Sequence, residues 1–372
     1  MVEWKKLDTL LDFEQPTPYL VKSTEYDDSY EIPVLTAGQS LLLGYTNETS
    51  GIYKADKNNP TIIFDDFTTS FHWIDFNFKV KSSAMKMLRP KKGVNFRYVY
   101  YSMRGINFVP GGHQRHWISK YSQFEIPFPS LSEQNRIVGI LDSFTSSIEN
   151  LKEQIAQRRK QYEYYRDQLL DLERKDGVDM KSLGKLCEIK GRIGFRGYTR
   201  EDQVEEGEGV ISLSPGNIED GKMVYNGCTY ITWDKYNESP EIMTFNGDVL
   251  FCKTGSTVGK VAMVDNLPCE ATINPQLVIL KNISINSKFL KYSLGTFRIQ
   301  SIVKRLAGVG SVPNISQEKL GNLEILLPSL SEQQRIVSIL DTFEASIQNL
   351  EAQLSQREKQ YEYYRNKLLT FD

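Results

Sequence analysis

The chain lacks the sequence signals of membrane, secreted and zinc-binding proteins. No run approaches the roughly 18 apolar residues of a membrane-spanning helix, and the opening MVEWKK is not followed by the apolar core of a signal peptide. We therefore expect a cytoplasmic protein. The 372 residues include four cysteines, none with C-x-x-C spacing, so neither a disulfide scaffold nor a structural zinc site is predicted, and buried reduced thiols are expected.

Catalytic signatures are also missing. The segment 255–261 resembles a phosphate-binding loop, but it is one residue short between its glycines and has Val261 where a serine or threonine is needed. Asn274-Pro275-Gln276 resembles part of the N-P-P-aromatic motif of DNA adenine methyltransferases, without its second proline or its aromatic residue. With three histidines and no nucleophile elbow, an independent hydrolase has little support. We expect no catalytic residue and no cofactor in this chain.

His113 and His116 have the spacing of a possible metal-ligand pair. They stand three residues apart, yet no cysteine or acidic residue lies near them in the sequence. A histidine near phosphate groups in a basic loop explains this pair without a metal. We therefore predict no metal site and keep His113 as a candidate nucleic-acid contact.

What the sequence does contain is a long internal repeat. Residues 129–170 align with residues 328–369, and 29 of the 42 aligned positions are identical. Both copies begin with Pro-Ser-Leu-Ser-Glu-Gln, in which the first serine and the glutamate three residues later fit a helix-capping box behind a proline. Each copy therefore predicts one long helix.

Apolar side chains in both copies recur at alternating steps of four and three, a period of 3.5 that is typical of a coiled-coil seam. The seams are Ile137, Leu141, Phe144, Ile148, Leu151, Ile155, Arg158, Tyr162, Tyr165, Leu169 and Leu172 in the first copy, and Ile336, Leu340, Phe343, Ile347, Leu350, Leu354, Arg357, Tyr361, Tyr364 and Leu368 in the second. One arginine interrupts each seam. It either pins the register or lays its stem along the seam with its head in solvent.

The rest of the chain forms two segments that precede the two helices. Both contain short β-rich runs between turn residues, such as 61–64, 248–251 and 276–280. Because domain termini usually lie close together, the second segment should start and end near the same point, so that the helices pair antiparallel with a globule at each end. The predicted class is α+β, with two mixed α/β domains (1–130 and 177–329) separated by two long helical regions (131–176 and 330–372) that pair as an antiparallel coiled coil.

The distribution of charge points to a nucleic acid although the total does not. The net charge of −2 and the pI of about 6.1 count against such a ligand. However, residues 76–124 contain ten basic residues and no acidic one, and residues 271–317 contain six basic residues and no acidic one. Both stretches stand directly before a predicted helix. We expect them to contact phosphate groups, against the alternative of an ordinary solvated surface.

Candidate nucleic-acid contacts come from these stretches, from the segment 253–260 and from the glycine-rich loop 190–200. Glycines in this loop let the backbone approach a ligand. An arginine can then bond O6 and N7 of guanine; the alternative is an ordinary loop. In the second segment the candidates are Arg192, Arg196, Lys253, Ser256, Thr257 and Lys260. In the first segment they are Lys91, Lys92, His113, Gln114 and Arg115.

Taken together, the chain resembles the specificity (S) subunit of a type I DNA restriction–modification system over its whole length. The most specific features are the duplicated helix start and the Gln-Tyr-Glu-Tyr-Tyr-Arg stretches at 161–166 and 360–365; the segments 191–200 and 247–251 are also similar. The resemblance implies two target recognition domains, each reading one half of a bipartite DNA site. It also implies two conserved helical regions that act as spacer and docking surface.

The same resemblance implies partners and a division of labour. Two modification subunits would supply adenine methylation with S-adenosylmethionine, and restriction subunits would add ATP- and Mg-dependent translocation and cleavage. This chain would recognise double-stranded DNA without a cofactor of its own. Two alternatives stay open: a self-contained methyltransferase or nuclease, which would bind S-adenosylmethionine alone, and a coiled-coil scaffold with two protein-binding heads, which would lack a salt-dependent affinity for DNA.

Overall fold

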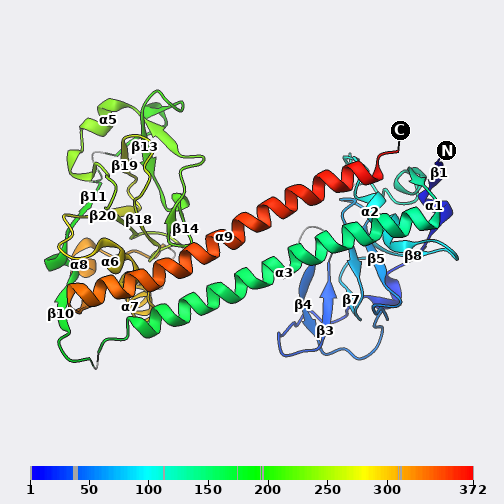
Figure 1. Cartoon of the computed structure of the whole chain (residues 1–372), viewed down its shortest axis with the longest axis horizontal. Helices are drawn as coiled ribbons and strands as arrows, with labels where there is room; N and C mark the ends of the chain where they lie inside the picture. The colour runs from blue at the N-terminus through cyan, green and yellow to red at the C-terminus, as the bar shows by residue number, and fades with distance from the viewer. Residues whose placement is uncertain are drawn as a thin grey trace. The chain divides into compact units, whose positions relative to one another are not determined.

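The computed structural model describes residues 2–36, 41–111, 114–173, 175–192, 194, 197–308, 310 and 312–371 (Figure 1). Contacts group the chain into two units. Unit 1 comprises Met1–Lys152 and Ala352–Asp372, and unit 2 comprises Glu153–Glu351. The division falls inside both long helices, α3 (Leu131–Leu169) and α9 (Leu330–Leu369), which have the positions that the repeat predicts.

Unit 1 contains a four-stranded antiparallel sheet in the order β2-β8-β5-β6 and a three-stranded sheet in the order β4-β3-β7. In the second sheet β3 and β7 run parallel. The strands are β1 (Glu3–Lys6), β2 (Leu11–Glu14), β3 (Ile32–Leu35), β4 (Leu42–Thr46), β5 (Thr61–Asp65), β6 (Phe71–Ile74), β7 (Lys79–Val80), β8 (Met85–Pro90) and β9 (Glu125–Phe128). The short helices are α1 (Leu7–Leu10), η1 (Thr17–Tyr19), α2 (Phe96–Met103) and η2 (Tyr121–Gln123).

Unit 2 contains two four-stranded sheets, β11-β20-β17-β18 and β12-β16-β13-β19. Its strands are β10 (Asp179–Ser182), β11 (Glu188–Gly191), β12 (Gln203–Val204), β13 (Val210–Leu213), β14 (Ile218–Glu219), β15 (Lys222–Met223), β16 (Thr229–Ile231), β17 (Val249–Cys252), β18 (Val261–Met263), β19 (Ala271–Ile273), β20 (Leu277–Lys281) and β21 (Glu324–Leu327). Its short helices are α4 (Leu183–Leu186), η4 (Arg200–Asp202), η5 (Pro215–Asn217), α5 (Trp233–Asn237), η6 (Pro240–Ile242), α6 (Ser287–Leu294), α7 (Phe297–Ala307) and α8 (Gln317–Gly321). The β-rich runs at 61–64, 248–251 and 276–280 thus form strands, as predicted.

The two units share one topology although their sequences differ before the helices. In each, the strand after the first short helix joins an antiparallel sheet of the same order, so that β2, β8, β5 and β6 correspond to β11, β20, β17 and β18. In each second sheet, one central strand has an antiparallel and a parallel neighbour: β3 in unit 1 and β13 in unit 2. The duplication therefore extends from the helices to the globular parts.

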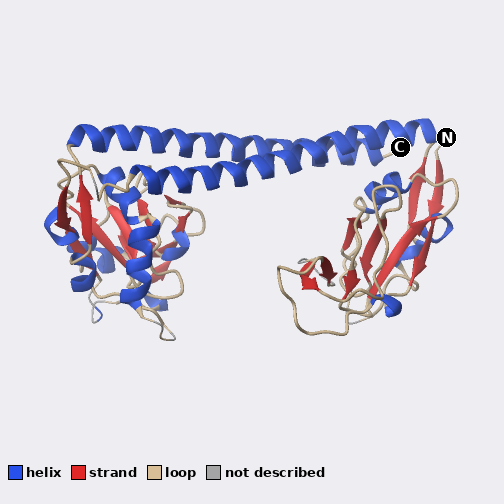
Figure 2. Ribbon diagram, turned by 90° about the horizontal axis from the view of Figure 1, so that it is seen from below, coloured by secondary structure: helices blue, strands red, loops and turns tan. Residues whose placement is uncertain are grey.

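Within each unit, α3 and α9 lie side by side (Figure 2) and run antiparallel, with side chains of the two seams in contact. In unit 1 the rings of Phe144 and Tyr364 stack with centroids 5.4 Å apart, and in unit 2 Tyr165 and Phe343 stack at the same distance. The arginines that interrupt the seam lie over these aromatic rings. Arg357 is 5.6 Å from the Phe144 ring centroid, and Arg158 is 6.0 Å from that of Phe343. Cation–π contact therefore accommodates each arginine within the seam.

The starts of both long helices are capped, but only half of the predicted capping box forms. The Ser130 hydroxyl accepts a hydrogen bond from the Glu133 N–H at 3.4 Å, and Ser329 accepts one from Glu332 at the same distance. The Glu133 carboxylate instead binds the Arg136 guanidinium at 2.6 and 2.8 Å. In the second repeat, Glu332 binds Arg335 in the same way, at 2.7 and 2.8 Å. The bidentate ion pair competes with the reciprocal bond to the helix N-terminus.

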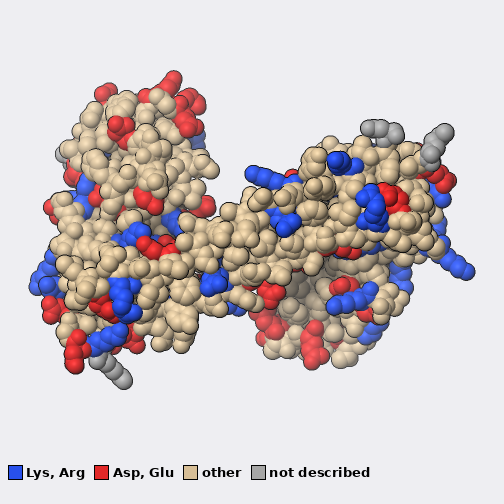
Figure 3. Space-filling view, viewed as in Figure 1, with Lys and Arg blue, Asp and Glu red and all other residues tan. Residues whose placement is uncertain are grey.

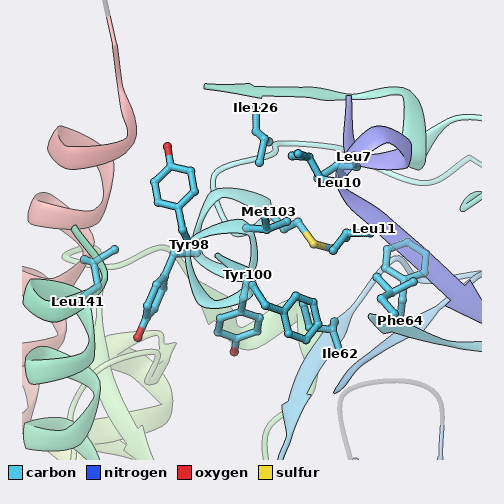
Figure 4. Close-up of a cluster of buried hydrophobic side chains, with 14 of the residues drawn as sticks. Leu7, Leu10, Leu11, Ile62, Phe64, Tyr98, Tyr100, Met103, Ile126 and Leu141 are labelled. Carbon is cyan, nitrogen blue, oxygen red and sulfur yellow. The ribbon is translucent and has the colours of Figure 1, made fainter. Parts of the chain in front are cut away.

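A helix of eight residues docks each globular part onto its long helix by equivalent contacts. In unit 1, α2 packs with Leu141 of α3 in one buried cluster, and Figure 4 shows Leu141 next to Tyr98. Arg97 and Tyr101 of α2 both bind Asp142. In unit 2, α6 packs on α9, and Lys288 and Tyr292 both bind Asp341, at 2.6 and 2.7 Å. Asp142 and Asp341 occupy the same repeat position, so the repeat specifies the docking as well as the helices.

The four cysteines are free thiols. Cys187 and Cys252 are buried as expected, whereas Cys228 and Cys269 are half-buried in the sheet region of unit 2. Burial raises the pKa of the Cys187 thiol to about 12, which keeps it protonated at neutral pH.

Candidate nucleic-acid interface

Much of the basic stretch in unit 1 is neutralised inside the fold. The Lys79 ammonium is buried 3.1 Å from the Glu48 carboxylate, and the Lys86 ammonium is buried 3.1 Å from Asp66. These acidic residues lie outside the stretch in the sequence, so counting charges along the chain could not reveal the pairing. Buried ion pairs of this kind hold the sheets and loops together and are not available to a ligand.

Three side chains of the basic stretch in unit 2 are paired with carboxylates of α9 or of the segment that follows α3. Lys288 binds Asp341, Lys291 binds Glu344 at 2.6 Å, and Arg298 binds Glu173 at 2.8 Å. In the view of Figure 3, basic and acidic side chains are interspersed within each unit. Accessible polar side chains on particular loops are therefore better candidates than the stretches as a whole.

The loop between β17 and β18 is the best-defined candidate surface in unit 2. Two other segments hold it: the Gly255 N–H donates to the Pro313 carbonyl at 2.9 Å, and the Lys253 N–H donates to the Gln276 carbonyl at 2.9 Å. Ser256 is exposed, and Lys253 and Thr257 are half-exposed. Three of the predicted contacts thus lie together on one anchored loop.

Lys260 and Arg192 instead have partners within unit 2. The Lys260 ammonium donates to the Ile218 carbonyl at 2.9 Å and to a second carbonyl at 3.3 Å. Arg192 is buried, and its guanidinium donates to the Thr272 hydroxyl and the Ile273 carbonyl, each at 3.1 Å. Burial lowers the pKa of Arg192. Both side chains support neighbouring loops in this structure, a role that the sequence pattern did not predict.

Amide side chains beside the β17–β18 loop were missed as candidates. Gln276 and Asn314 are exposed, and Asn314 accepts a hydrogen bond from the Thr254 hydroxyl at 2.7 Å. Asn274 donates to the Gln276 side chain at 3.3 Å. Amides of this type can bond N6 and N7 of adenine. The sequence signal for these candidates is the pair of amides in Asn274-Pro275-Gln276, which also resembles part of a methyltransferase motif.

In unit 1 the corresponding loop joins β5 to β6. The segment with Gln114 and Arg115, both exposed, leads to Trp117, whose N–H donates to the Asp66 carboxylate of this loop at 2.7 Å. The structure thereby brings the segment that carries these two predicted contacts to the β5–β6 loop, although the two are distant in the sequence. Arg196 and His113 lie outside the described residues.

The two lysines between β8 and α2 differ in their surroundings. The Lys91 ammonium donates to the Asp8 carbonyl at 2.6 Å and lies 3.7 Å from the Asp12 carboxylate. Lys92 is exposed. Of the two, Lys92 presents its ammonium to a ligand more freely, because Lys91 is already engaged with the neighbouring α1–β2 segment.

Four further features bear on the other classes of function. Among the described residues, no group of three or more His, Cys, Asp or Glu side chains could hold a metal ion. His116 is buried against the Phe108 ring. The segment 255–261, which resembles a phosphate-binding loop, runs from strand β17 into strand β18 and so lacks the helix N-terminus on which such loops depend. No helix in the described part of the chain offers an apolar stretch that could span a bilayer.

Comparison with known proteins defines the family. The family described as type I restriction modification DNA specificity domain matches residues 1–158 and 175–358. The chain belongs to this family, whose members are DNA-recognition subunits and not catalytic ones. It is a specificity subunit that recognises DNA sequence.

Individual relatives agree with this assignment. The chain is 38% identical over 390 residues to the Escherichia coli specificity subunit of the type I restriction enzymes EcoR124I/EcoR124II, covering all of this chain and 94% of the relative. It is 26% identical to a putative type I specificity subunit of Haemophilus influenzae, covering all of this chain and 96% of that one. The crystal structure of an S subunit from M. genitalium has the same fold, with a TM-score of 0.62 at 18% identity, covering all of this chain and 97% of the other.

Proposed function

We propose that each unit reads one half of a bipartite DNA site through the loop that follows the third strand of its main sheet. The observation that supports this most strongly is the duplicated sheet with different side chains on the equivalent loops. In unit 2 the loop residues are Lys253, Ser256 and Thr257, joined by Gln276 and Asn314. In unit 1 the exposed Gln114 and Arg115 come from the segment that Trp117 joins to the β5–β6 loop, and Lys92 adds a basic contact from beyond the opposite end of β8. Lysine contributes affinity for phosphate groups, and the amides and arginine read bases.

A domain exchange tests this assignment. Residues 1–130 are replaced by the corresponding domain of another specificity subunit, and the modified bases in cells carrying the methyltransferase are mapped by sequencing. One half of the methylated motif should change while the other half stays the same. A change in both halves would contradict the division of reading between the units.

The catalytic steps belong to partner subunits in this proposal. Two modification subunits supply adenine methylation with S-adenosylmethionine, and restriction subunits use ATP and Mg. The isolated chain should therefore neither methylate nor cut DNA, and methylation should appear when a modification subunit is added. Methyl transfer by the pure chain, measured with labelled S-adenosylmethionine, would instead support a self-contained enzyme.

A further inference from the structure

Among the residues that the structure describes, one crevice in unit 1 has two arginines and no acidic residue in its wall. Its volume is about 310 Å³, and it lies between the β5–β6 loop, the end of α2 and the last turns of α9. Thr69 and Ser70 come from the loop, Arg104 is the C-cap of α2, and Arg365 comes from α9. Arg365 is also the last residue of the second Gln-Tyr-Glu-Tyr-Tyr-Arg stretch, which the proposed function leaves unexplained.

Neither guanidinium is neutralised by a carboxylate within the described part of the chain. Arg104 donates to the Tyr100 hydroxyl at 2.6 Å, and Arg365 donates to the Asn366 side-chain oxygen at 3.1 and 3.2 Å. Both guanidiniums lie near the buried Tyr361 hydroxyl: burial raises the pKa of Tyr361, and the two positive charges oppose that rise. Two charges of one sign without a counter-ion favour an anionic ligand.

The equivalent place in unit 2 lacks this excess of positive charge. Gly295 follows α6 as Arg104 follows α2, and a side chain there would begin 3.8 Å from the Arg166 guanidinium. Arg166 is the repeat equivalent of Arg365, but it is paired with Asp167 at 3.0 Å, where unit 1 has Asn366. The shared fold therefore does not require two uncompensated arginines, and their presence distinguishes unit 1.

We propose that the Arg104–Arg365 crevice binds a phosphate group of the DNA backbone beside the half-site of unit 1. The proposal rests on the proposed function, because the β5–β6 loop that forms one wall is the counterpart of the β17–β18 loop. Guanidinium groups match the geometry of phosphate oxygens. Such a contact fixes the position of unit 1 on the duplex without reading bases.

The test uses the full chain assembled with its modification subunits and two duplexes, one with the methylated motif and one without it. There are two variants. One is the double variant R104A with R365A, and the other is N366D, which gives Arg365 the acidic partner that Arg166 has in unit 2. Both should weaken binding to both duplexes alike. Losing one phosphate contact lowers the salt slope by about 0.9, so the ratio of affinities at 50 and 200 mM salt should fall about threefold. The methylated motif should not change.

R166A is the matched control, because it removes the arginine at the same repeat position in unit 2, where Asp167 already pairs with it. Its salt slope should equal that of the original protein. If both crevice variants keep the salt slope of the original protein, and the original protein still binds its motif specifically, the crevice proposal is wrong but the proposed function stands. If the crevice variants bind DNA normally as free subunits but no longer assemble with the modification subunits, the crevice binds a carboxylate of the partner. That result would also overturn the phosphate proposal. If the original complex shows no motif preference, the proposed function fails and the crevice proposal falls with it.

Discussion

The Lys291 ammonium lies 2.6 Å from the Glu344 carboxylate, and the corresponding positions in the other unit hold Tyr100 and Thr145. The lysine and glutamate side chains are 9% and 18% exposed, so the pair is largely withdrawn from water. Burial lowers the pKa of Lys291, and Glu344 opposes that shift. Lys291 and Glu344 thus form a matched pair specific to unit 2, next to the shared aspartate contact, whereas in unit 1 the Thr145 hydroxyl lies 3.2 Å from the Tyr101 hydroxyl.

The first prediction concerns this matched pair. E344T should destabilise unit 2 by about 3 kcal/mol, because it leaves a buried ammonium without a counter-charge. The double variant K291Y with E344T, which copies unit 1, should recover most of that loss. Urea unfolding of the full chain, followed by a probe in unit 2, measures both. Equal stability of the single and double variants would show that the pair is not matched.

The second prediction concerns pH and Glu48. Burial raises its pKa, but the Ser23 N–H, the Lys79 ammonium and the Lys22 N–H outweigh burial and hold the pKa below its usual 4.5. A carboxyl group with a lowered pKa contributes stability above its unfolded pKa, and loses that contribution as the pH falls through the folded pKa. E48Q should therefore cost about 3 kcal/mol at pH 7, because the buried Lys79 loses its partner.

The difference between E48Q and the original protein should shrink as the pH falls from 7 through the folded pKa of Glu48. Urea midpoints over a series of acidic pH values, from a probe in unit 1, provide the comparison. A difference that does not depend on pH would mean that Glu48 acts through packing and not through charge.

The third prediction separates base reading from phosphate binding. Q276A should relax selection in one half of the methylated motif by about 1–3 kcal/mol, because an exposed amide beside the β17–β18 loop is suited to adenine. K92A should weaken binding to every sequence and lower the salt slope by about 1, with the motif unchanged. Methylome sequencing and salt titrations distinguish the two. A motif altered by K92A would reverse the roles assigned here.

The fourth prediction concerns the length of the helices. One heptad inserted between Gln157 and Arg158, and another between Gln356 and Arg357, keeps the 3.5 period and adds about 10 Å to each helix. The unread gap in the methylated motif should grow by about three base pairs at ~3.4 Å each, while the bases at its ends stay the same. An active variant that keeps the original gap would show that the helices do not set the spacing.

The long helices could be predicted from the sequence because their signals are local. The apolar seam and the proline before each helix can be read within one helix, and the identical positions can be read by aligning the two copies. Three strands were also predicted correctly from short β-rich runs. The shared sheet order could not be predicted, since strand pairing such as β5 with β8 depends on contacts between distant residues that no single segment encodes.

The candidate site was predicted less completely for the same reason. Lys86 and Asp66 are separated by twenty residues in the sequence but form one buried pair, so the basic stretch overstated the free positive charge. Ser256 and Thr257 could be proposed from the sequence because they stand in a glycine-rich turn. Asn314 could not be proposed, because only the fold brings it to that turn.

The different contacts of Thr145 and Glu344 also bear on which recombinant genes encode a well-packed protein. The coding segments for 129–170 and 328–369 specify similar residues, so a crossover between them fuses the first globular part to the second helix. If the crossover falls before codon 145, the Tyr101 hydroxyl meets the acidic Glu344; if it falls after that codon, the Thr145 hydroxyl is retained as its partner. Both products keep the aspartate that α2 binds. A difference of a few codons in the point of exchange thus decides whether the fused domain inherits its own anchor or a foreign one.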